Sequence, residues 1–296
     1  MDGIFNINKA TGMTSHDVVA KIRKHLKQKR VGHAGTLDPM ASGVLPICVG
    51  QATRVAEYLS ESGKAYQAEI IFGAATDTYD TEGTITSTAS TADLNLAIIE
   101  ETLEHFRGPQ MQFPPLYSAI KIQGQPAYKR ARAGEEIALE PRPIVIYSLE
   151  ILDWIPPRLT LAIECSKGTY IRSLAHDLGT RLGCYAYLGA LVRTRSGPFT
   201  LSESITIEQL ADAVETNSVQ QYHFPVDKAL EQYPAIKLDA ETVERVKHGN
   251  TFYNPAANNP GLVRVYDTNG DFLAIAEWDE EQKGWQPKKV FAISDI

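Results

Sequence analysis

The apolar positions of residues 15–26 recur with the period of a helix. They form one stripe that consists of Val18, Val19, Ile22 and Leu26. Thr14 or Ser15 can cap the first turn, and Lys and Arg gather at the C-terminal end, where the helix dipole favours them. We therefore expect a basic amphipathic helix that leads into residues 32–46, which read GHAGTLDPMASGVLP.

Strict alternation follows in residues 65–73, AYQAEIIFG, where one face carries Tyr66, Ala68, Ile70 and Phe72. This pattern predicts a strand, and the acidic turn and the short TITS run after it suggest a hairpin. Residues 93–106 return to a helical period, with Leu94, Ile98 and Leu103 expected to face inward and Gly108-Pro109 expected to end the helix.

Residues 112–144 show no clean period, and so long an irregular segment in a compact domain is usually functional or disordered. Strand patterns resume in residues 145–155 and 158–165, and residues 167–183 change from strand to helix. Because strands and helices are mixed without a βαβ rhythm, we expect an α+β fold, a mixed, largely antiparallel sheet flanked by helices.

A domain boundary is expected within residues 218–234, after a helical pattern at 206–215. Beyond it, three short apolar runs separated by turn signals predict a small β-rich unit. We divide the chain into a larger domain, 1–229, and a small C-terminal domain, 230–296.

The chain has 296 residues, of which 43% are apolar, and can bury a sizeable core. No apolar run approaches the roughly 18 residues of a membrane helix, and the N-terminus lacks the layout of a signal peptide, so we expect a cytoplasmic protein. Three widely spaced cysteines without CxxC spacing support neither a disulfide framework nor a zinc site.

The net charge of −7 is unevenly distributed. Residues 1–60 carry eight basic and four acidic residues, whereas residues 203–296 carry eight basic and sixteen acidic ones. Six Lys or Arg fall within residues 21–30 alone. Local patches of this kind can bind RNA, but they are equally compatible with solvated helix faces.

Motifs for nucleotide cofactors, zinc proteases and serine hydrolases are absent: there is no GxGxxG before a helix, no HExxH, no GxSxG and no Walker sequence. What remains are single functional groups in Gly-rich or irregular places, namely His33, Asp38, Tyr66, Tyr170 and Arg172. Each also has an ordinary interpretation: a turn for Asp38-Pro39, core packing for the tyrosines, loop hydrogen bonding for His33 and a surface helix start for Arg172.

Residues 32–54, GHAGTLDPMASGVLPICVGQATR, resemble the catalytic motif of the bacterial tRNA pseudouridine-55 synthases, the TruB family. Further stretches match in the family's order: NKATGMTSHDVV, GKAYQAEIIFGAATDTYDTEG, PPLYSAIKIQGQPAYKRARAG and KGTYIRSLAHDLG. The resemblance covers about residues 3–200. One departure is Lys9-Ala10, where the family commonly has Lys-Pro, which bears on the stiffness of the first loop.

The resemblance implies that Asp38 is the nucleophile or base that opens the C1′–N1 bond of a uridine, and that Arg172 pairs with it. Tyr66 would lie under the flipped base and Tyr170 and Leu191 would complete the pocket. His33 would occupy the space that the flipped base leaves, or stack on the RNA side. This isomerisation requires no metal and no redox cofactor, and none is expected.

The family also implies a tRNA partner, bound through the T-arm, and an RNA-clasping insertion at about residues 114–142. Its expected phosphate contacts are Lys121, Lys129, Arg130 and Arg132, with Tyr117 and Tyr128 packing or stacking. Lys9 is a further expected RNA contact, and the C-terminal unit resembles a PUA-type RNA-binding domain. We expect a monomer without membrane contact.

Three functions therefore stay open: an RNA uridine isomerase, a non-catalytic RNA-binding or RNA-folding protein, and a small-molecule hydrolase with an Asp nucleophile. The isomerase is favoured by the ordered set of motifs.

Overall fold

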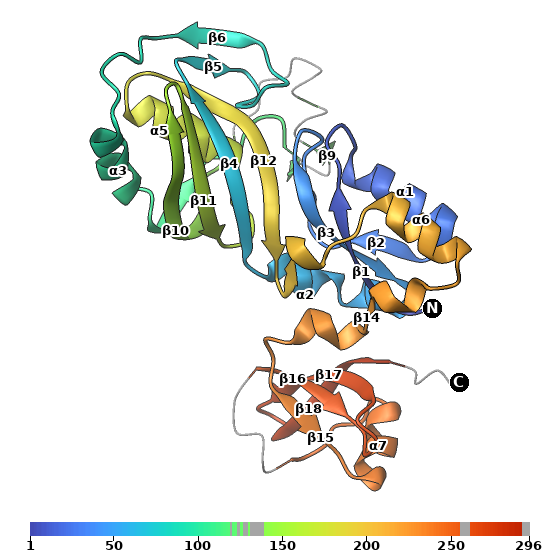
Figure 1. Cartoon of the computed structure of the whole chain (residues 1–296). Helices are drawn as coiled ribbons and strands as arrows, with labels where there is room; N and C mark the ends of the chain where they lie inside the picture. The colour runs from blue at the N-terminus through green and yellow to red at the C-terminus, as the bar shows by residue number, and fades with distance from the viewer. Residues whose placement is uncertain (119, 123–124, 127–129, 131–138, 255–260, 292–296) are drawn as a thin grey trace.

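A ten-stranded sheet forms the larger part of the molecule in the computed structural model, which describes residues 1–118, 120–122, 125–126, 130, 139–254 and 261–291 (Figure 1). Its main path runs β14-β1-β3-β12-β4-β11-β10-β7, and β2 pairs with β3 and β13 with β12. The strands are β1 (Gly3–Lys9), β2 (Val31–His33), β3 (Ser42–Val49), β4 (Lys64–Phe72), β7 (Gly108–Gln112), β10 (Arg142–Ile155), β11 (Arg158–Cys165), β12 (Ala186–Ser196), β13 (Phe199–Thr200) and β14 (His223–Phe224).

Neighbouring strands of this sheet are antiparallel, except that β12 and β3 pair in parallel over a short stretch. There Val192 and Arg193 lie beside Ser42 and Gly43. Gly43 has φ +100°, and a Cβ on it would lie 2.3 Å from the Arg193 carbonyl oxygen, so only glycine permits this close approach. The prediction of a mixed, largely antiparallel α+β fold is confirmed.

The helices of the larger unit are α1 (Ser15–Leu26), α2 (Ala56–Glu61), α3 (Leu96–Glu104), α5 (Ile171–Arg181) and α6 (Ile207–Glu215). Figure 1 shows α1 and α6 side by side at the end of the sheet that contains β1 to β3. Thr14 caps α1 as predicted, in a capping box with Asp17 that contributes about 1 kcal/mol. No helix in the described part of the chain is long and apolar enough to cross a membrane.

The prediction for α3 was partly wrong. The helix begins after Asn95, whose side chain accepts a hydrogen bond from the Ile98 amide, so it starts later than residue 93. Ile99 and Leu103 are buried, whereas Ile98 is 41% exposed. Leu94 and Leu103 contact the core as predicted, and Ile99 takes the buried position that was expected for Ile98.

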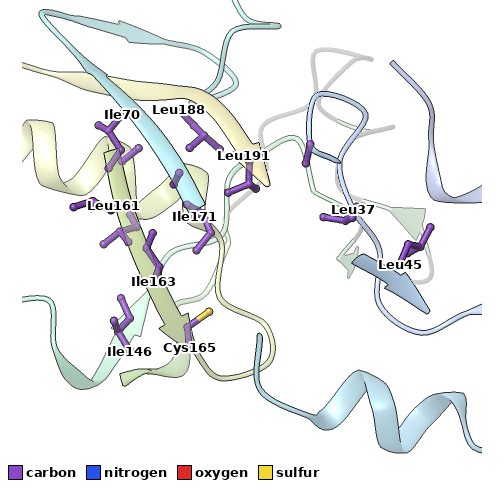
Figure 2. Close-up of a cluster of buried hydrophobic side chains, with 14 of the residues drawn as sticks. Leu37, Leu45, Ile70, Ile146, Leu161, Ile163, Cys165, Ile171, Leu188 and Leu191 are labelled. Atoms are coloured by element: carbon purple, nitrogen blue, oxygen red, sulfur yellow. The ribbon is translucent and has the colours of Figure 1, made fainter. Parts of the chain in front are cut away.

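The main core lies against the sheet strands and α5 (Figure 2). Figure 2 shows Ile70 of β4, Leu161 and Ile163 of β11, Leu188 of β12 and Ile171 of α5 among the clustered side chains. Each fully buried aliphatic side chain of this kind contributes about 1.5–3 kcal/mol. This rigid centre fixes the start of α5 and the middle of β4 and β12, which carry candidate site residues.

Among the described residues, two further pairs of short strands lie apart from the two larger sheets. One consists of β5 (Ala74–Thr76) and β6 (Ile85–Thr88). The TITS run therefore forms a strand, but it pairs with β5 and not with β4, as the predicted hairpin required. The other consists of β8 (Lys121–Ile122) and β9 (Gln125–Pro126) within the segment that has no clean sequence period.

The C-terminal unit is a four-stranded sheet in the order β15-β16-β17-β18, with one helix. Its elements are β15 (Ala235–Lys237), α7 (Ala240–Lys247), β16 (Leu262–Tyr266), β17 (Phe272–Asp279) and β18 (Gly284–Val290). The three predicted strands are confirmed, and the unit has its own core around Val246, Val265 and Trp285. The boundary between residues 229 and 230 stays a prediction.

Figure 1 shows this unit below the large sheet, next to α2. Ile275 and Phe291 join a buried cluster with Leu59 of α2, and the Arg54 guanidinium lies 4.8 Å from the centre of the Phe291 ring. Lys289 donates to the Arg54 carbonyl and pairs with Glu57. The two units are therefore joined by apolar packing, by the Arg54–Phe291 contact and by the Lys289–Glu57 ion pair.

Candidate active site

A cavity of about 230 Å³ opens where the loop after β2 meets β4, β12 and the N-terminus of α5. Five residues that the sequence pointed to line it: Asp38, Tyr66, Tyr170, Arg172 and Leu191. The two that are furthest apart in the sequence, Asp38 and Leu191, are separated by 153 positions. Figure 2 shows Ile171 and Leu191 at the edge of the core, and both line the cavity together with Leu37.

Asp38 lies in the loop between β2 and β3, and its neighbours are fastened to the N-terminal segment. The Ser15 hydroxyl donates to the Leu37 carbonyl at 3.1 Å and accepts from the Leu37 amide at 2.9 Å. The Gly12 amide donates to the Pro39 carbonyl at 2.8 Å. The Asp38 side chain itself is 37% exposed. The backbone is thus held on both sides of a carboxylate that faces the cavity.

The guanidinium of Arg172 connects Asp38 to a second carboxylate. Its Nε lies 2.9 Å from Asp38 Oδ2 as an ion pair without an aligned N–H···O bond, and Nη1 lies 3.5 Å from Asp80 Oδ2. Arg172 also donates to the carbonyls of Thr78, at 3.2 Å, and Tyr117, at 3.0 Å. With only 5% of this side chain exposed, the cation is surrounded by partners and stabilises the negative charge of Asp38.

The sequence interpretation missed Asp80, which it treated as part of an acidic turn. Only 3% of this side chain is exposed. Oδ1 accepts from the Thr78 hydroxyl at 2.6 Å and from the Glu82 amide at 3.0 Å, in an Asx-type turn. Asp77 and Asp80, three positions apart, look alike in the sequence of this turn, and only the tertiary contact with Arg172 distinguishes Asp80.

Arg193 was also missed, because it lies inside a strand and its side chain is 1% exposed. Its guanidinium donates to three carbonyls, those of Val44 at 2.7 Å, Thr36 at 3.3 Å and Gly35 at 3.1 Å. Two of these belong to the loop that carries Asp38. Arg193 therefore fixes that loop against β12 and places a positive charge under the cavity, and burial lowers its pKa.

Tyr66 lies on β4, opposite Ile163 of β11 and Arg193 of β12. Burial raises the pKa of its phenol, and the adjacent Arg193 guanidinium partly opposes that effect. The hydroxyl therefore stays protonated at neutral pH and can donate a hydrogen bond into the cavity.

Tyr170 is fixed at the start of α5 by Gln112. The Gln112 side chain accepts from the Tyr170 amide at 2.8 Å and donates to the Tyr170 carbonyl at 3.0 Å. Burial raises the pKa of the Tyr170 phenol. Leu191, 7% exposed, supplies apolar surface on the same cavity.

His33 ends β2 and is not among the residues that line the cavity. Its ring meets the His16 ring edge-on, with centroids 5.3 Å apart. Burial, together with His16 and Arg193, lowers the pKa of His33 to about 4, so the ring is neutral at physiological pH. Its stacking on RNA stays a prediction, and a neutral flat ring suits that role.

Lys9 differs from the expected RNA contact. The side chain is 0% exposed, and Nζ donates to the carbonyls of Ala10, Met13 and Pro39. Burial lowers its pKa to about 8. An ammonium that is enclosed by three carbonyls holds the first loop to the Asp38 loop, and it does not present its charge to RNA. These bonds stabilise the loop in which Ala10 stands where the family commonly has proline.

Lys64 lines the cavity and was not predicted as a site residue. Nζ donates to the carbonyls of Leu59, Ser60 and Ser62 at the C-terminal end of α2, and burial lowers its pKa to about 8.

The expected phosphate contacts of residues 114–142 remain predictions. Lys121 begins β8, and Arg130 is half-buried. Lys129 and Arg132 lie outside the described residues, as does Tyr128.

Comparison with known proteins supports a single class. Residues 23–171 match the N-terminal domain of TruB family pseudouridylate synthases, residues 172–231 match the tRNA pseudouridylate synthase B C-terminal domain, and residues 234–284 match the C-terminal domain of pseudouridine synthase II TruB. The matched domains and the fold are those of a pseudouridine synthase.

Among the relatives, the tRNA pseudouridine synthase B of Dehalococcoides mccartyi is 44% identical over 291 residues, which cover 98% of this chain and 97% of the relative. That of Clostridium kluyveri is 44% identical over 280 residues, 93% of this chain and 95% of the relative. The chain belongs to the TruB family of pseudouridylate synthases.

A solved Cbf5-Nop10-Gar1 complex contains a similar chain, with a TM-score of 0.79 and 28% identity over 98% of this chain and 85% of that one. A second similar chain occurs in an H/ACA RNP bound to a substrate RNA that contains 2′-deoxyuridine, with a TM-score of 0.77 and 27% identity over 99% of this chain and 86% of that one.

Proposed function

We propose that this protein converts uridine 55 in the T-loop of tRNA to pseudouridine, with Asp38 as the reacting carboxylate. The observation that carries the proposal is the buried Arg172, which lies between the carboxylates of Asp38 and Asp80 at the wall of the cavity. The family membership and the relatives named tRNA pseudouridine synthase B support the same reaction and the same class of RNA.

The target uridine must leave the base stack of the T-loop before it can reach Asp38. Extruding a base costs a few kcal/mol, which contacts in the enzyme must replace. In this proposal the Tyr66 ring stacks on the flipped base, and Leu191 and Tyr170 cover the remaining apolar surface. His33 stacks on the RNA outside the cavity and stabilises the opened loop.

The reaction exchanges one bond of the ribose for another. Asp38 acts as a nucleophile or as a base, the C1′–N1 bond breaks, the base turns, and C1′ bonds to C5 of the same ring. The proton on C5 then leaves, and N1 gains one, so that substrate and product have the same atoms. The carboxylate must be ionised and correctly aimed, which the Arg172 ion pair and the fastened loop provide.

The basic residues at and after the end of α1 suit the delivery of the T-arm. Lys24, Lys27, Lys29 and Arg30 are exposed, and they immediately precede β2 and the Asp38 loop. Contacts from such residues to phosphates position an RNA without reading its sequence. We infer that the T-stem phosphates lie along this edge and that residues 114–142 close on the loop.

Asp38→Asn tests the proposed reaction. The amide keeps the shape of the carboxylate but loses its charge and its nucleophilicity, so turnover should fall below detection, while Kd for tRNA changes less than about threefold. Pseudouridine would be mapped in unmodified tRNA after incubation with wild type and variant.

A tRNA with uridine 55 replaced by cytidine serves as the substrate control. Turnover by Asp38→Asn above a trace would remove Asp38 from the chemistry. Tight tRNA binding by a wild type that forms no pseudouridine would favour the non-catalytic RNA-binding function instead, and absence of tRNA affinity would favour the hydrolase.

A further inference from the structure

Tyr79 adopts a backbone conformation that aromatic residues rarely take. Its φ is +64°, in the left-handed region, which costs roughly 1–2 kcal/mol for a residue with a Cβ. It lies in the turn between β5 and β6, where its carbonyl accepts from the amide of Leu188, near the start of β12, at 2.9 Å. Something in the surroundings must keep the turn in this conformation.

The Tyr79 ring is stacked on the ring of His176, with centroids 3.9 Å apart and planes inclined by 12°. His176 lies in α5, four residues after Arg172, and residues at i and i+4 share one helix face. The same face therefore contacts three consecutive residues of the turn. Arg172 binds the Thr78 carbonyl and the Asp80 carboxylate, and His176 covers the Tyr79 ring between them.

Simple packing does not account for a left-handed tyrosine in this position. Tyr185 is also left-handed, with φ +58°, but its side chain is 38% exposed. Tyr79 differs because its ring is stacked on the helix that carries Arg172.

We propose that Tyr79 and His176 are positioning residues, whose stacked rings hold the turn of residues 78–80 so that Thr78 and Asp80 fix Arg172 against Asp38. The inference rests on the proposed function, because the stacked rings affect catalysis only through Arg172 and Asp38. Without the stack the turn relaxes, Asp80 moves away from Arg172, and the guanidinium loses the partner that opposes its rotation. The cavity is altered only at this wall, so the affinity for tRNA is unchanged.

Three variants separate the ring from the backbone strain. Tyr79→Gly removes the ring and leaves a residue that can adopt many backbone conformations, so nothing at this position holds the turn. His176→Ala removes the other ring, and His176→Phe keeps a flat ring in its place. Tyr185→Gly is the matched control, a left-handed tyrosine outside the Arg172 contacts.

We expect Tyr79→Gly and His176→Ala each to lower kcat about tenfold and to change KM less than about twofold. The double variant should be no slower than either single one, because both remove the same interaction. His176→Phe should restore kcat to within about threefold of wild type, and Tyr185→Gly should match wild type. Wild-type kcat in Tyr79→Gly, or independent losses that multiply in the double variant, would overturn the proposal.

A measurement without RNA separates this inference from the proposed function. The Nε–H resonance of Arg172 in the NMR spectrum of the free protein should move in Tyr79→Gly and His176→Ala, and should stay at the wild-type position in His176→Phe and Tyr185→Gly. If wild type forms no pseudouridine, the proposed function fails, but the Arg172 resonance still tests whether Tyr79 and His176 position Arg172. A resonance that stays unmoved in both Tyr79→Gly and His176→Ala contradicts that positioning role.

Discussion

Tyr66 is half-buried beside Arg193, and its ring and its hydroxyl can be tested separately. Tyr66→Phe keeps the ring and loses the hydroxyl, whereas Tyr66→Leu loses both. If the hydroxyl takes part in proton transfer at C5, both variants lose about 10²-fold or more in kcat. If only stacking matters, Phe retains most of the activity and Leu does not. Single-turnover rates with saturating enzyme distinguish these cases, and wild-type rates for both variants would exclude Tyr66 from the site.

Asp177 lies in α5, and ionisation of its carboxyl group lowers the stability of the folded state. Burial raises its pKa from 3.8 to about 6, so the folded state binds the proton more tightly than the unfolded state does. The stability contributed by this group is present at pH 4 and is lost as the pH rises through 6.

Asp177→Asn should therefore unfold at nearly the wild-type Tm at pH 4, and at a higher Tm above pH 7. After a discount for partial exposure we expect about 1 kcal/mol, or about 2–4 °C. Thermal unfolding between pH 4 and pH 8 provides the measurement. Exposed Asp153, replaced by Asn, is the control and should change Tm little. A difference that shrinks with rising pH would contradict the assignment.

At the level of residues, the sequence indicated those polar side chains that stand out from their local pattern. Asp38 in a Gly-flanked loop, Tyr66 at a strand start and Arg172 at a helix start were all found, and all line one cavity. Asp80 and Arg193 were missed because nothing local distinguishes an Asp in an Asx turn or an Arg in a strand. The RNA contact of Lys9 stays a prediction, and the enclosure of its ammonium by three carbonyls could not be recognised from the sequence alone.

At the level of elements, the site depends on the helix and strands that hold the Asp38 loop in place. The Asp38 loop has no regular structure, yet α1 binds it through Ser15, β1 through Lys9 and β12 through Arg193. Local patterns predicted α1, β4, β10, β11 and α5, because each has clear periodicity or capping. They did not predict the pairing of β12 between β3 and β4, which brings Arg193 under the loop, since partners distant in sequence are chosen by the whole core.

At the level of the whole molecule, the acidic C-terminal unit is attached firmly to α2. Lys289 pairs with Glu57, lies over the Tyr58 ring at 5.2 Å and donates to the Arg54 carbonyl. This lysine therefore contributes to the junction between the two sheets. A charge variant at Lys289 would disturb that junction as well as any RNA contact, so it is unsuitable for a test of the charge distribution.

The uneven charge predicts that tRNA affinity depends on salt mainly through the end of α1. Lys27, Lys29 and Arg30 are exposed and lie after the last residue of the helix, so replacing all three with Gln should leave folding intact. Each phosphate contact adds roughly 0.7–0.9 to the slope of log K against log salt concentration. The triple variant should therefore lower the magnitude of that slope by about 2–3 and raise KM for tRNA, with little change in kcat at saturation.

The matched control replaces three exposed lysines of the C-terminal unit, Lys237, Lys283 and Lys288, with Gln. Lys288 is already paired with Glu277 at 2.7 Å, and the unit is rich in carboxylates, so these lysines attract phosphates less. The control should change the salt slope by less than about 1. A larger loss of slope in the control than in the α1 variant would show that the C-terminal unit is the main binding surface for tRNA, because counterion release reports where the phosphates are neutralised.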